Sequence, residues 1–310
     1  MSGVVGAWLP PAEDEHLLQR LAPMLRALQQ RGRGRIGYWT DAGAGLALGH
    51  CRAPTDTPLQ PLSSDCGRYV LCLDGRLYNR SDLQAQLRDL PRSCSDARLL
   101  LQAIVEWGVE RALSRIEGAF GFSVWDREAR ELWLARDRVG ERPLYYGWYQ
   151  GQFLFASELK ALQAFAGFAP GIDQDALSLL LRHDYVPAPH TIYRGIHKLV
   201  AGAMLRIDLN DHAAGGSSQA TQGGSRYWCA RDAMQSALQE PLQPAPSLEQ
   251  ATDQLEAVLQ KAIAARMHSP LACGAFLSGG TDSSLVTAMM QAQSTLPIEA
   301  WTVGFDDPGH

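Results

Sequence analysis

The sequence lacks the features of a membrane, exported or nucleic-acid-binding protein. No apolar run approaches the ~20 residues that span a bilayer. The N-terminal segment VVGAWLPP is too short for a signal peptide, and acidic residues follow it at once. The formal net charge is -5, from 28 Lys and Arg against 33 Asp and Glu, whereas nucleic acids and anionic membranes require a basic face. We therefore expect a cytoplasmic protein that binds neither nucleic acid nor a membrane.

Metal-binding and disulfide patterns are also missing. Six cysteines show neither CxxC pairing nor metal-ligand spacing with histidine, namely Cys51, Cys66, Cys72, Cys94, Cys229 and Cys273. In a chain without an export signal such cysteines are most simply reduced, buried thiols. Three further histidines, His183, His190 and His197, have no partners at metal-ligand spacing and are expected to be structural. The basic segment RGRGR, residues 31–35, is expected to be a solvated turn.

The first two thirds of the chain combine helical segments with a dense β region. Helical spacing of apolar residues predicts helices over 13–32, 81–90, 95–107, 157–165 and 173–181. We expect Ser81 to cap the second of these helices, and Ser95 or Asp96 to begin the third, which ends at Gly108. Alternating apolar residues and tight turns predict strands over 36–39, 45–50, 68–75, 119–126, 131–137, 143–149, 152–159 and 203–209. These strands are expected to form an antiparallel sheet with one face buried.

A change in composition predicts a second domain. Residues 209–226 are rich in Gly, Ser, Gln and Ala without apolar periodicity, as in a flexible connection. A helix over 247–267 and then a strand, a glycine-rich loop, a helix and a strand follow, which is the opening of a parallel α/β domain. A single βαβ unit has too little core to stand alone, so we expect a truncated chain or a piece of a longer gene. The predicted organisation is residues 1–208, a connection over 209–226, and residues 227–310.

The segment SGGTDSS, residues 278–284, is the strongest local motif. Its two glycines let the backbone approach a ligand closely, and the following helix would direct N–H groups and a partial positive charge at the same point. Ser278, Ser283 and Ser284 add hydroxyl groups, and Asp282 could hold Mg²⁺ against phosphate oxygens. The alternative is a Gly-Ser turn with Asp282 as a helix cap. The order of strand, loop and helix favours phosphate binding, although the Walker A pattern is absent.

Motifs along nearly the whole chain resemble one family in that family's order. SGGxDS resembles the pyrophosphate loop of the ATP pyrophosphatases, which adenylate a carboxylate and release pyrophosphate. The chain as a whole resembles the glutamine-hydrolysing asparagine synthase family. The segments that carry this resemblance are IEGAFGFSVWDREARELWLARDRVGERPLYYG, FASELKAL, HDYVPAPHTIYRGIHKL and AFLSGGTDSSLVTAMM. The resemblance implies an N-terminal nucleophile amidotransferase domain, an αββα sandwich, followed by the first βαβ part of an ATP pyrophosphatase synthetase domain.

The resemblance also implies a reaction and its ligands. In the family the first domain hydrolyses glutamine, and ammonia passes through an internal channel. The second domain forms β-aspartyl-AMP, which ammonia converts to asparagine. The implied small-molecule partners are glutamine or ammonia, aspartate and ATP with Mg²⁺, and the assembly could be a homodimer. The residues implied to hold ATP and diphosphate are Ser278, Gly279, Gly280, Asp282, Ser283 and Val303, with Asp282 also on Mg²⁺. Val303 lies in TVGF, residues 302–305, which the family uses as the strand end that meets the adenine.

The residues that match the family's glutaminase site depart from its pattern. Family members begin Met-Cys-Gly, and the cysteine, freed by removal of the methionine, attacks glutamine with its α-amine (pKa ~7.7–8.0) as base. This chain has Ser2, whose hydroxyl forms far less anion near neutral pH. The family's NGE motif, whose Asn and Gly form the oxyanion hole, corresponds to Asp74, Gly75 and Arg76. Loss of one oxyanion donor costs ~2.7–4 kcal/mol of barrier, and Arg76 would repel the ammonium of glutamine.

Two other matching positions keep the family's residues. Arg52 and Asp96 could still hold the carboxylate and amine of glutamine. The alternative is structural, with Asp96 capping a helix and Arg52 on a solvated turn. The family's RGPD loop corresponds to RGRG, residues 31–34, without its proline and aspartate. The three substitutions at the nucleophile and NGE positions outweigh these two matching residues, so we expect a weak or inactive glutaminase site.

The leading interpretation is therefore an ATP-dependent amide ligase of the asparagine synthase type with a degenerate amidotransferase domain. A first alternative keeps the fold: β-lactam synthetases and lasso-peptide cyclases resemble this family and have lost the N-terminal cysteine. Against this alternative, bacterial asparagine synthases are more similar to the segments DRVGERPLYYG and VPAPHTIYRGIHKL. A second alternative is a non-catalytic, nucleotide-binding product. We expect the run 136–138 to fix the geometry of a turn rather than to take part in chemistry.

Overall fold

The computed structural model describes residues 2–32, 35–52, 59–88, 90–91, 93–208, 224–239, 245–267 and 273–304. The chain forms two compact units, residues 1–234 and 235–310, and each is considered by itself. Within the described ranges, no helix has both the length and the apolar character of a membrane span.

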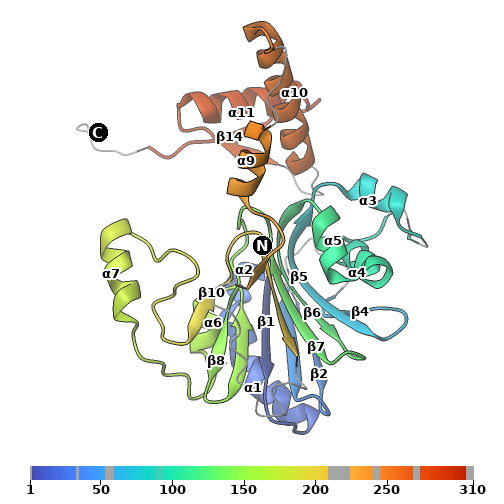
Figure 1. Ribbon diagram of the computed structural model, residues 1–310, viewed down its shortest axis with the longest axis vertical. Helices are drawn as coiled ribbons and strands as arrows, with labels where there is room; N and C mark the ends of the chain where they lie inside the picture. The colour runs from blue at the N-terminus through green and yellow to red at the C-terminus, as the bar shows by residue number, and fades with distance from the viewer. Residues whose placement is uncertain are drawn as a thin grey trace. The chain divides into compact units, whose positions relative to one another are not determined.

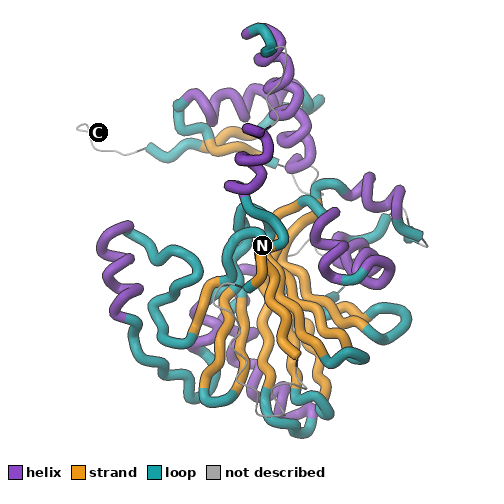
Figure 2. The backbone as a smooth tube through the Cα atoms, in the orientation of Figure 1, coloured by secondary structure: helices purple, strands orange, loops and turns teal. Residues whose placement is uncertain are grey.

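Two six-stranded antiparallel sheets form the centre of the first unit (Figures 1 and 2). The first sheet has the order β10-β8-β9-β1-β3-β2, with β1 (Gly3–Trp8), β2 (Ile36–Asp41), β3 (Leu46–Cys51), β8 (Tyr145–Tyr149), β9 (Gln152–Ala156) and β10 (Ile196–Lys198). The second has the order β12-β11-β7-β6-β5-β4, with β4 (Leu62–Ser63), β5 (Tyr69–Leu77), β6 (Gly118–Asp126), β7 (Glu131–Arg136), β11 (Ala203–Asp208) and β12 (Ser225–Arg226). Apolar residues of both sheets pack into one shared cluster.

Helices cover the outer face of each sheet. The first sheet packs against α1 (Asp14–Ala27) and α6 (Leu159–Gln163), and α2 (Gln29–Gly32) follows α1. The second sheet packs against α3 (Arg80–Gln86), α4 (Asp96–Trp107) and α5 (Val109–Arg115). By contrast, α7 (Gln174–His183) buries only Ala176 and stands away from the sheets in Figure 1. The predicted αββα sandwich is therefore confirmed.

Alternation along the strands produces the three apolar layers. In β5, Leu71 and Leu73 belong to the cluster under the helices, whereas Val70 and Cys72 belong to the cluster between the sheets. Neighbouring side chains of a strand point to opposite faces, so β5 is apolar on both faces. Each fully buried Leu or Val contributes about 1.5–3 kcal/mol relative to exposure, which explains why these runs form central strands.

The predicted helix ends are only partly correct. Helix α4 begins after Ser95, whose Oγ accepts a 3.2 Å hydrogen bond from Arg98 N, and ends at Gly108 with φ 80°, as expected. The predicted cap at Ser81 is wrong, because α3 begins at Arg80 after Asn79 and ends at Gln86. Helices α5 and α9 (Ala230–Gln239) were not predicted.

The second unit contains the predicted βαβ arrangement. It comprises α10 (Leu248–Met267), β13 (Gly274–Phe276), α11 (Thr281–Ala292) and β14 (Glu299–Trp301), and β13 pairs in parallel with β14. Its buried cluster is small and includes Ile263, Ala275 and Met290. Most of the predicted connection lies outside the described residues, but Ser225 and Arg226 form β12, so the second sheet includes the last two residues of that segment.

Candidate functional site

Ser2 and Asp74 face each other between the two sheets. Val4 and Cys72 belong to the cluster between the sheets. Asp74 follows Cys72 by two residues and so lies on the same face of β5. Ser2 precedes Val4 by two residues, directly before β1. The Oγ of Ser2 donates a 2.9 Å hydrogen bond to Oδ1 of Asp74. Ser2 is only 5% exposed and Asp74 is completely buried. The fold therefore brings together the expected nucleophile position and an expected oxyanion-hole position.

Arg31 joins this pair from α2. Its Nη2 lies 2.7 Å from Oδ2 of Asp74, and its Nε donates a 2.7 Å hydrogen bond to the carbonyl oxygen of Ser2. Its Nη1 lies 3.2 Å from Oε1 of Glu158. The side chain of Arg31 is 9% exposed. The expectation of a solvated turn is therefore wrong for Arg31, because its guanidinium sits in a buried ion pair, while residues 33–34 of that turn lie outside the described ranges.

Ser157, directly after β9, completes the shell around the carboxylate. Its Oγ donates a 3.2 Å hydrogen bond to Oδ2 of Asp74 and accepts a 3.0 Å hydrogen bond from the N–H of Val4. Burial raises the pKa of Asp74 above its usual value, and the charges of Arg31 and Arg142 oppose that rise. Since Arg31 and both hydroxyls donate to the carboxylate, these contacts fit its ionised form. We call this set, Ser2, Arg31, Asp74 and Ser157, the Asp74 cluster.

The second expected oxyanion-hole position is Gly75. Its φ is +154°, and a Cβ at this position would lie 2.1 Å from the carbonyl oxygen of Ala119 on the paired strand. Glycine is therefore required by the close approach of β5 and β6. Beside it, an ionised Asp74 has no proton to donate, so its side chain cannot act as an oxyanion donor.

The three residues expected to hold glutamine lie on different elements. Asp96, the first residue of α4, forms an ion pair with Arg80 and accepts a 3.2 Å hydrogen bond from the N–H of Leu77. Its carboxylate thus ties α4 to the end of β5, while Ser95 supplies the helix cap. Half-buried Arg76 shares the strand face of Asp74, two residues further along β5, and half-buried Arg52 follows β3 directly.

Two buried side chains that the sequence did not reveal support β5 beside Asp74. The N–H of Leu73 donates a 2.6 Å hydrogen bond to Oε1 of Gln60, and Nε2 of His50 lies 3.1 Å from the carbonyl oxygen of Leu73. Burial lowers the pKa of His50 to about 4, so the ring is neutral near pH 7. The motif FASELKAL contains Ser157, but nothing in it indicated a contact with Asp74.

The glycine-rich loop of the second unit has the expected strand-loop-helix geometry. Gly279 has φ +83° with open space around it, and Gly280 is the N-cap of α11 without a side-chain cap. The alternative in which Asp282 caps the helix is therefore wrong, since Asp282 lies exposed in the first turn. Oγ of Ser283 accepts a 3.3 Å hydrogen bond from Ser278 N and donates a 3.1 Å one to Gly280 O, which holds the loop closed on itself.

The donor set of this loop fits a phosphate group and its cation. A helix N-terminus, a glycine in the left-handed region and serine hydroxyls offer hydrogen-bond donors to phosphate oxygens, and the Asp282 carboxylate is a suitable ligand type for Mg²⁺. Val303 is 79% exposed after β14. The expected strand end at TVGF is wrong in extent, because β14 ends at Trp301 and residues 302–304 follow it as a loop; Phe305 lies outside the described residues.

The run 136–138 has the expected structural role. The buried Arg136 guanidinium donates to three backbone carbonyls, those of Gly140, Arg142 and Leu199. The buried Asp137 carboxylate accepts from four backbone N–H groups, those of Phe120, Val139, Glu141 and Arg142. The expectation of buried thiols holds only for Cys51 and Cys72, whereas Cys66 is exposed.

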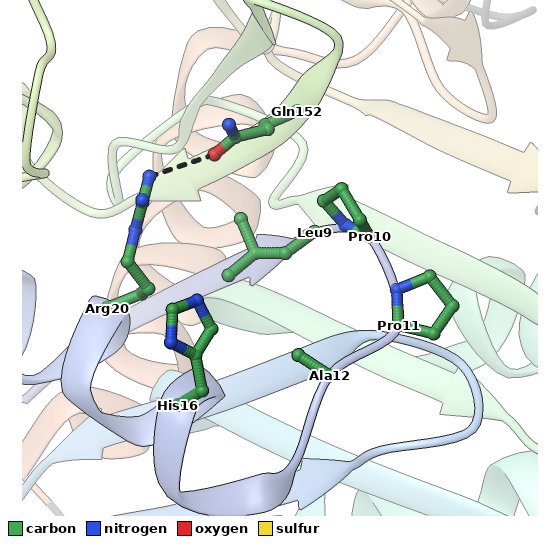
Figure 3. A pocket seen from close by; sticks show the side chains of 7 residues that line it. All are labelled: Leu9, Pro10, Pro11, Ala12, His16, Arg20 and Gln152. Carbon is green, nitrogen blue, oxygen red and sulfur yellow. Dashed lines mark hydrogen bonds between the residues drawn. The ribbon is translucent and has the colours of Figure 1, made fainter.

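A separate surface pocket lies at the other end of β1 (Figure 3). Its walls are Leu9, Pro10, Pro11, Ala12, His16, Arg20 and Gln152. Nη2 of Arg20 donates a 3.1 Å hydrogen bond to Oε1 of Gln152, and the guanidinium stacks on Phe165. The seven steps of strand from Ser2 to Leu9 span about 23 Å. This pocket therefore contains no residue that the sequence predicts for either site.

The chain matches two family models and is similar to curated relatives. Residues 1–218 match the glutamine amidotransferase domain, and residues 254–310 match the asparagine synthase domain. A putative glutamine-hydrolysing asparagine synthetase of Mycobacterium bovis is 32% identical over 302 residues, covering 91% of this chain and 43% of that protein. Glutamine-hydrolysing asparagine synthetase 3 of Bacillus subtilis is 28% identical, covering 93% of this chain and 46% of that protein. The chain thus spans less than half the length of these curated relatives.

A solved structure shares the fold at low sequence identity. The glutamine phosphoribosylpyrophosphate amidotransferase of B. subtilis, complexed with ADP and GMP, superposes with a TM-score of 0.50 at 19% identity, covering 97% of this chain and 65% of that one. Its likeness bears on the fold alone. The chain therefore belongs to the family of proteins with this glutamine amidotransferase domain, and over both of its matched domains it is similar to glutamine-hydrolysing asparagine synthetases.

Proposed function

We propose that this chain works in ATP-dependent amide formation of the asparagine synthase type, with ammonia rather than glutamine as the effective nitrogen source. The proposed substrates are aspartate and ATP with Mg²⁺. The glutamine-hydrolysing site, at Ser2, Asp74 and Gly75 with Arg52, Arg76 and Asp96 around it, is proposed to be weak or inactive. A cytoplasmic location and a homodimer are parts of the same proposal.

The observation that carries the proposal is the hydrogen bond from Ser2 to Asp74. A nucleophile needs a base that takes its proton and donors that receive the oxyanion. Here the hydroxyl is directed at a buried carboxylate, which repels a developing oxyanion. Asp96, expected to hold the substrate amine, is engaged by Arg80. These contacts support a pocket whose polar groups satisfy one another.

The nucleotide half of the proposal rests on the loop after β13. Ser278, Gly279, Gly280 and Ser283 would hold the phosphates, Asp282 would hold Mg²⁺, and the backbone around Val303 would meet the adenine. Bound ATP with Mg²⁺ would supply an activated adenylyl group for a carboxylate, with pyrophosphate as the leaving group. The part of this chain in that step is to orient the phosphates through backbone N–H groups and hydroxyls.

Two measurements on the purified chain test the proposal. Calorimetry with ATP and Mg²⁺ is expected to show binding that is lost in Gly279→Asp, where a carboxylate would occupy the open space beside the loop. Glutamate release from glutamine is expected to be at background. Absence of nucleotide binding, or steady glutamate release that Ser2→Ala abolishes, would contradict the respective half.

A further inference from the structure

We propose that Asp74 sets the reactivity of the side chain at position 2. Its carboxylate disfavours an anion on that side chain. This carboxylate, rather than the exchange of cysteine for serine, is then the main obstacle to nucleophilic attack. This inference rests in part on the proposed function, which identifies position 2 as the nucleophile position. Its central prediction concerns the ionisation of a side chain and needs no glutamine.

Distance makes Asp74 the dominant charge at this atom. Asp74 Oδ1 is 2.9 Å from Ser2 Oγ, whereas Arg31 contacts the Ser2 carbonyl oxygen instead of its hydroxyl. The Arg31 guanidinium is also shared between Asp74 and Glu158. Among the charged side chains, any anion formed at position 2 would therefore meet the Asp74 carboxylate at contact distance, while the α-amine of the same residue, freed by removal of Met1, is the positive group nearest to it. In a buried site this repulsion is weakly screened.

The surrounding charges predict what removal of that carboxylate does. Oε2 of Glu158 lies 2.8 Å from Nζ of Lys160, and the charge of Arg142 also acts on Asp74. If Asp74 became an amide, Glu158 would be the remaining carboxylate among the positive charges of Arg31, Arg142 and Lys160. The neutral thiol of Cys51 and the phenol of Tyr145, both with pKa values raised by burial, add no charge near pH 7. The three cations already exceed the two carboxylates by one charge, so this excess would rise to two, and an amide N–H could donate to an anion at position 2.

A cysteine placed at position 2 reports this directly. In Ser2→Cys the thiol pKa is expected to lie above the usual ~8.5. In Ser2→Cys combined with Asp74→Asn it is expected to fall by at least about one unit, which is a tenfold rise in thiolate well below the pKa. The rate of iodoacetamide alkylation at position 2 against pH, followed by peptide mass mapping, separates this thiol from the six native cysteines.

A matched control separates charge from hydrogen bonding. Ser2→Cys with Ser157→Ala removes a hydroxyl from the same carboxylate without changing its charge, and is expected to leave the thiol pKa high. Circular dichroism and the mass of the N-terminal peptide verify folding and removal of Met1. If the variant with Asp74→Asn does not fold, Ser2→Cys alone still decides, because a thiol pKa below ~8.5 in that variant overturns the inference.

Glutamate release distinguishes this inference from the proposed function. Release by the Ser2→Cys, Asp74→Asn variant and not by Ser2→Cys alone is the expected result. A fall in thiol pKa without release would support the role of Asp74 and would agree with the proposed function, in which Asp96 is engaged by Arg80. Glutamate release by the natural chain that Asp74→Asn abolishes would overturn the inference, since Asp74 would then be the general base of Ser2.

Discussion

Asp74 and Arg31 form a buried ion pair, with Oδ2 and Nη2 2.7 Å apart, inside the layer between the two sheets. The pair connects β5 to α2, and through the Ser2 carbonyl oxygen it also fixes the start of β1. The position proposed for the glutamine-hydrolysing site is thus held together by its own charges. The stability of the first unit should therefore depend on residues that match the family's catalytic positions.

Removal of the positive partner should be costly. Arg31→Met keeps the apolar stem but leaves the Asp74 carboxylate buried without its counter-charge, and such changes cost about 3–5 kcal/mol. We expect a loss of about 3 kcal/mol in the free energy of unfolding, measured with urea. The control is Arg206→Met, which breaks the 3.2 Å pair of a 53% exposed arginine with Glu131 and should cost less than about 1 kcal/mol. Equal losses in both variants would refute a structural role for the Asp74 cluster.

The close approach of β5 and β6 makes Gly75 intolerant of a side chain. Gly75→Ala places Cβ 2.1 Å from the carbonyl oxygen of Ala119, so the strands must separate, and we expect a loss of about 3 kcal/mol or more. Gly67 has φ +73° but no atom within 4 Å of a built Cβ, so Gly67→Ala should show only the backbone cost of about 1–2 kcal/mol. Urea unfolding of both variants measures the difference, and a Gly75→Ala protein as stable as Gly67→Ala would argue against the strand contact.

His50 should make stability depend on pH in the acid range. Burial lowers its pKa from 6.5 to about 4, so the folded state binds fewer protons than the unfolded state between these values. Its contribution is fully present above about pH 6.5 and is lost as the pH falls towards 4, amounting to about 3 kcal/mol in total.

The variant His50→Gln keeps a donor near the Leu73 carbonyl and removes the titration. Its free energy of unfolding is therefore expected to vary less between pH 6.5 and 4 than that of the natural chain. Exposed His16 provides the control, since His16→Gln should leave the profile unchanged. Parallel profiles for the natural chain and His50→Gln would show that another group causes any acid instability.

Asp282 should affect nucleotide binding without affecting folding. The side chain is exposed in the first turn of α11, so Asp282→Asn removes the proposed Mg²⁺ ligand at little cost in stability. We expect the affinity for ATP with Mg²⁺ to fall about tenfold, which corresponds to ~1.4 kcal/mol, by calorimetry. Asp253→Asn, on the exposed surface of α10, should change neither quantity. An unaltered affinity in Asp282→Asn would remove Asp282 from the proposed site.

Much of the fold was predictable because its signals are local. Alternation over 119–126 and 131–137 predicted β6 and β7 to within one residue, and the cap at Ser95 and the stop at Gly108 bounded α4. The end of α3 was less predictable, because apolar residues up to Leu90 continue a helical pattern after the helix has ended. Helix α5 was missed because a second short helix after a glycine stop has no distinct local signal.

The sequence by itself determined most strands, although not β1, β4, β10 or β12, together with the glycine-rich loop and the three substituted family positions. These features depend on neighbours within a few residues. Only the tertiary structure decided what the Asp74 carboxylate does, since its partners Ser2, Arg31 and Ser157 lie 72, 43 and 83 residues away in the chain. Pairing over such separations depends on which strand faces meet when the two sheets pack. In the sequence, Asp74 indicates only the loss of an oxyanion-hole donor. In the folded molecule its carboxylate forms a buried ion pair with Arg31.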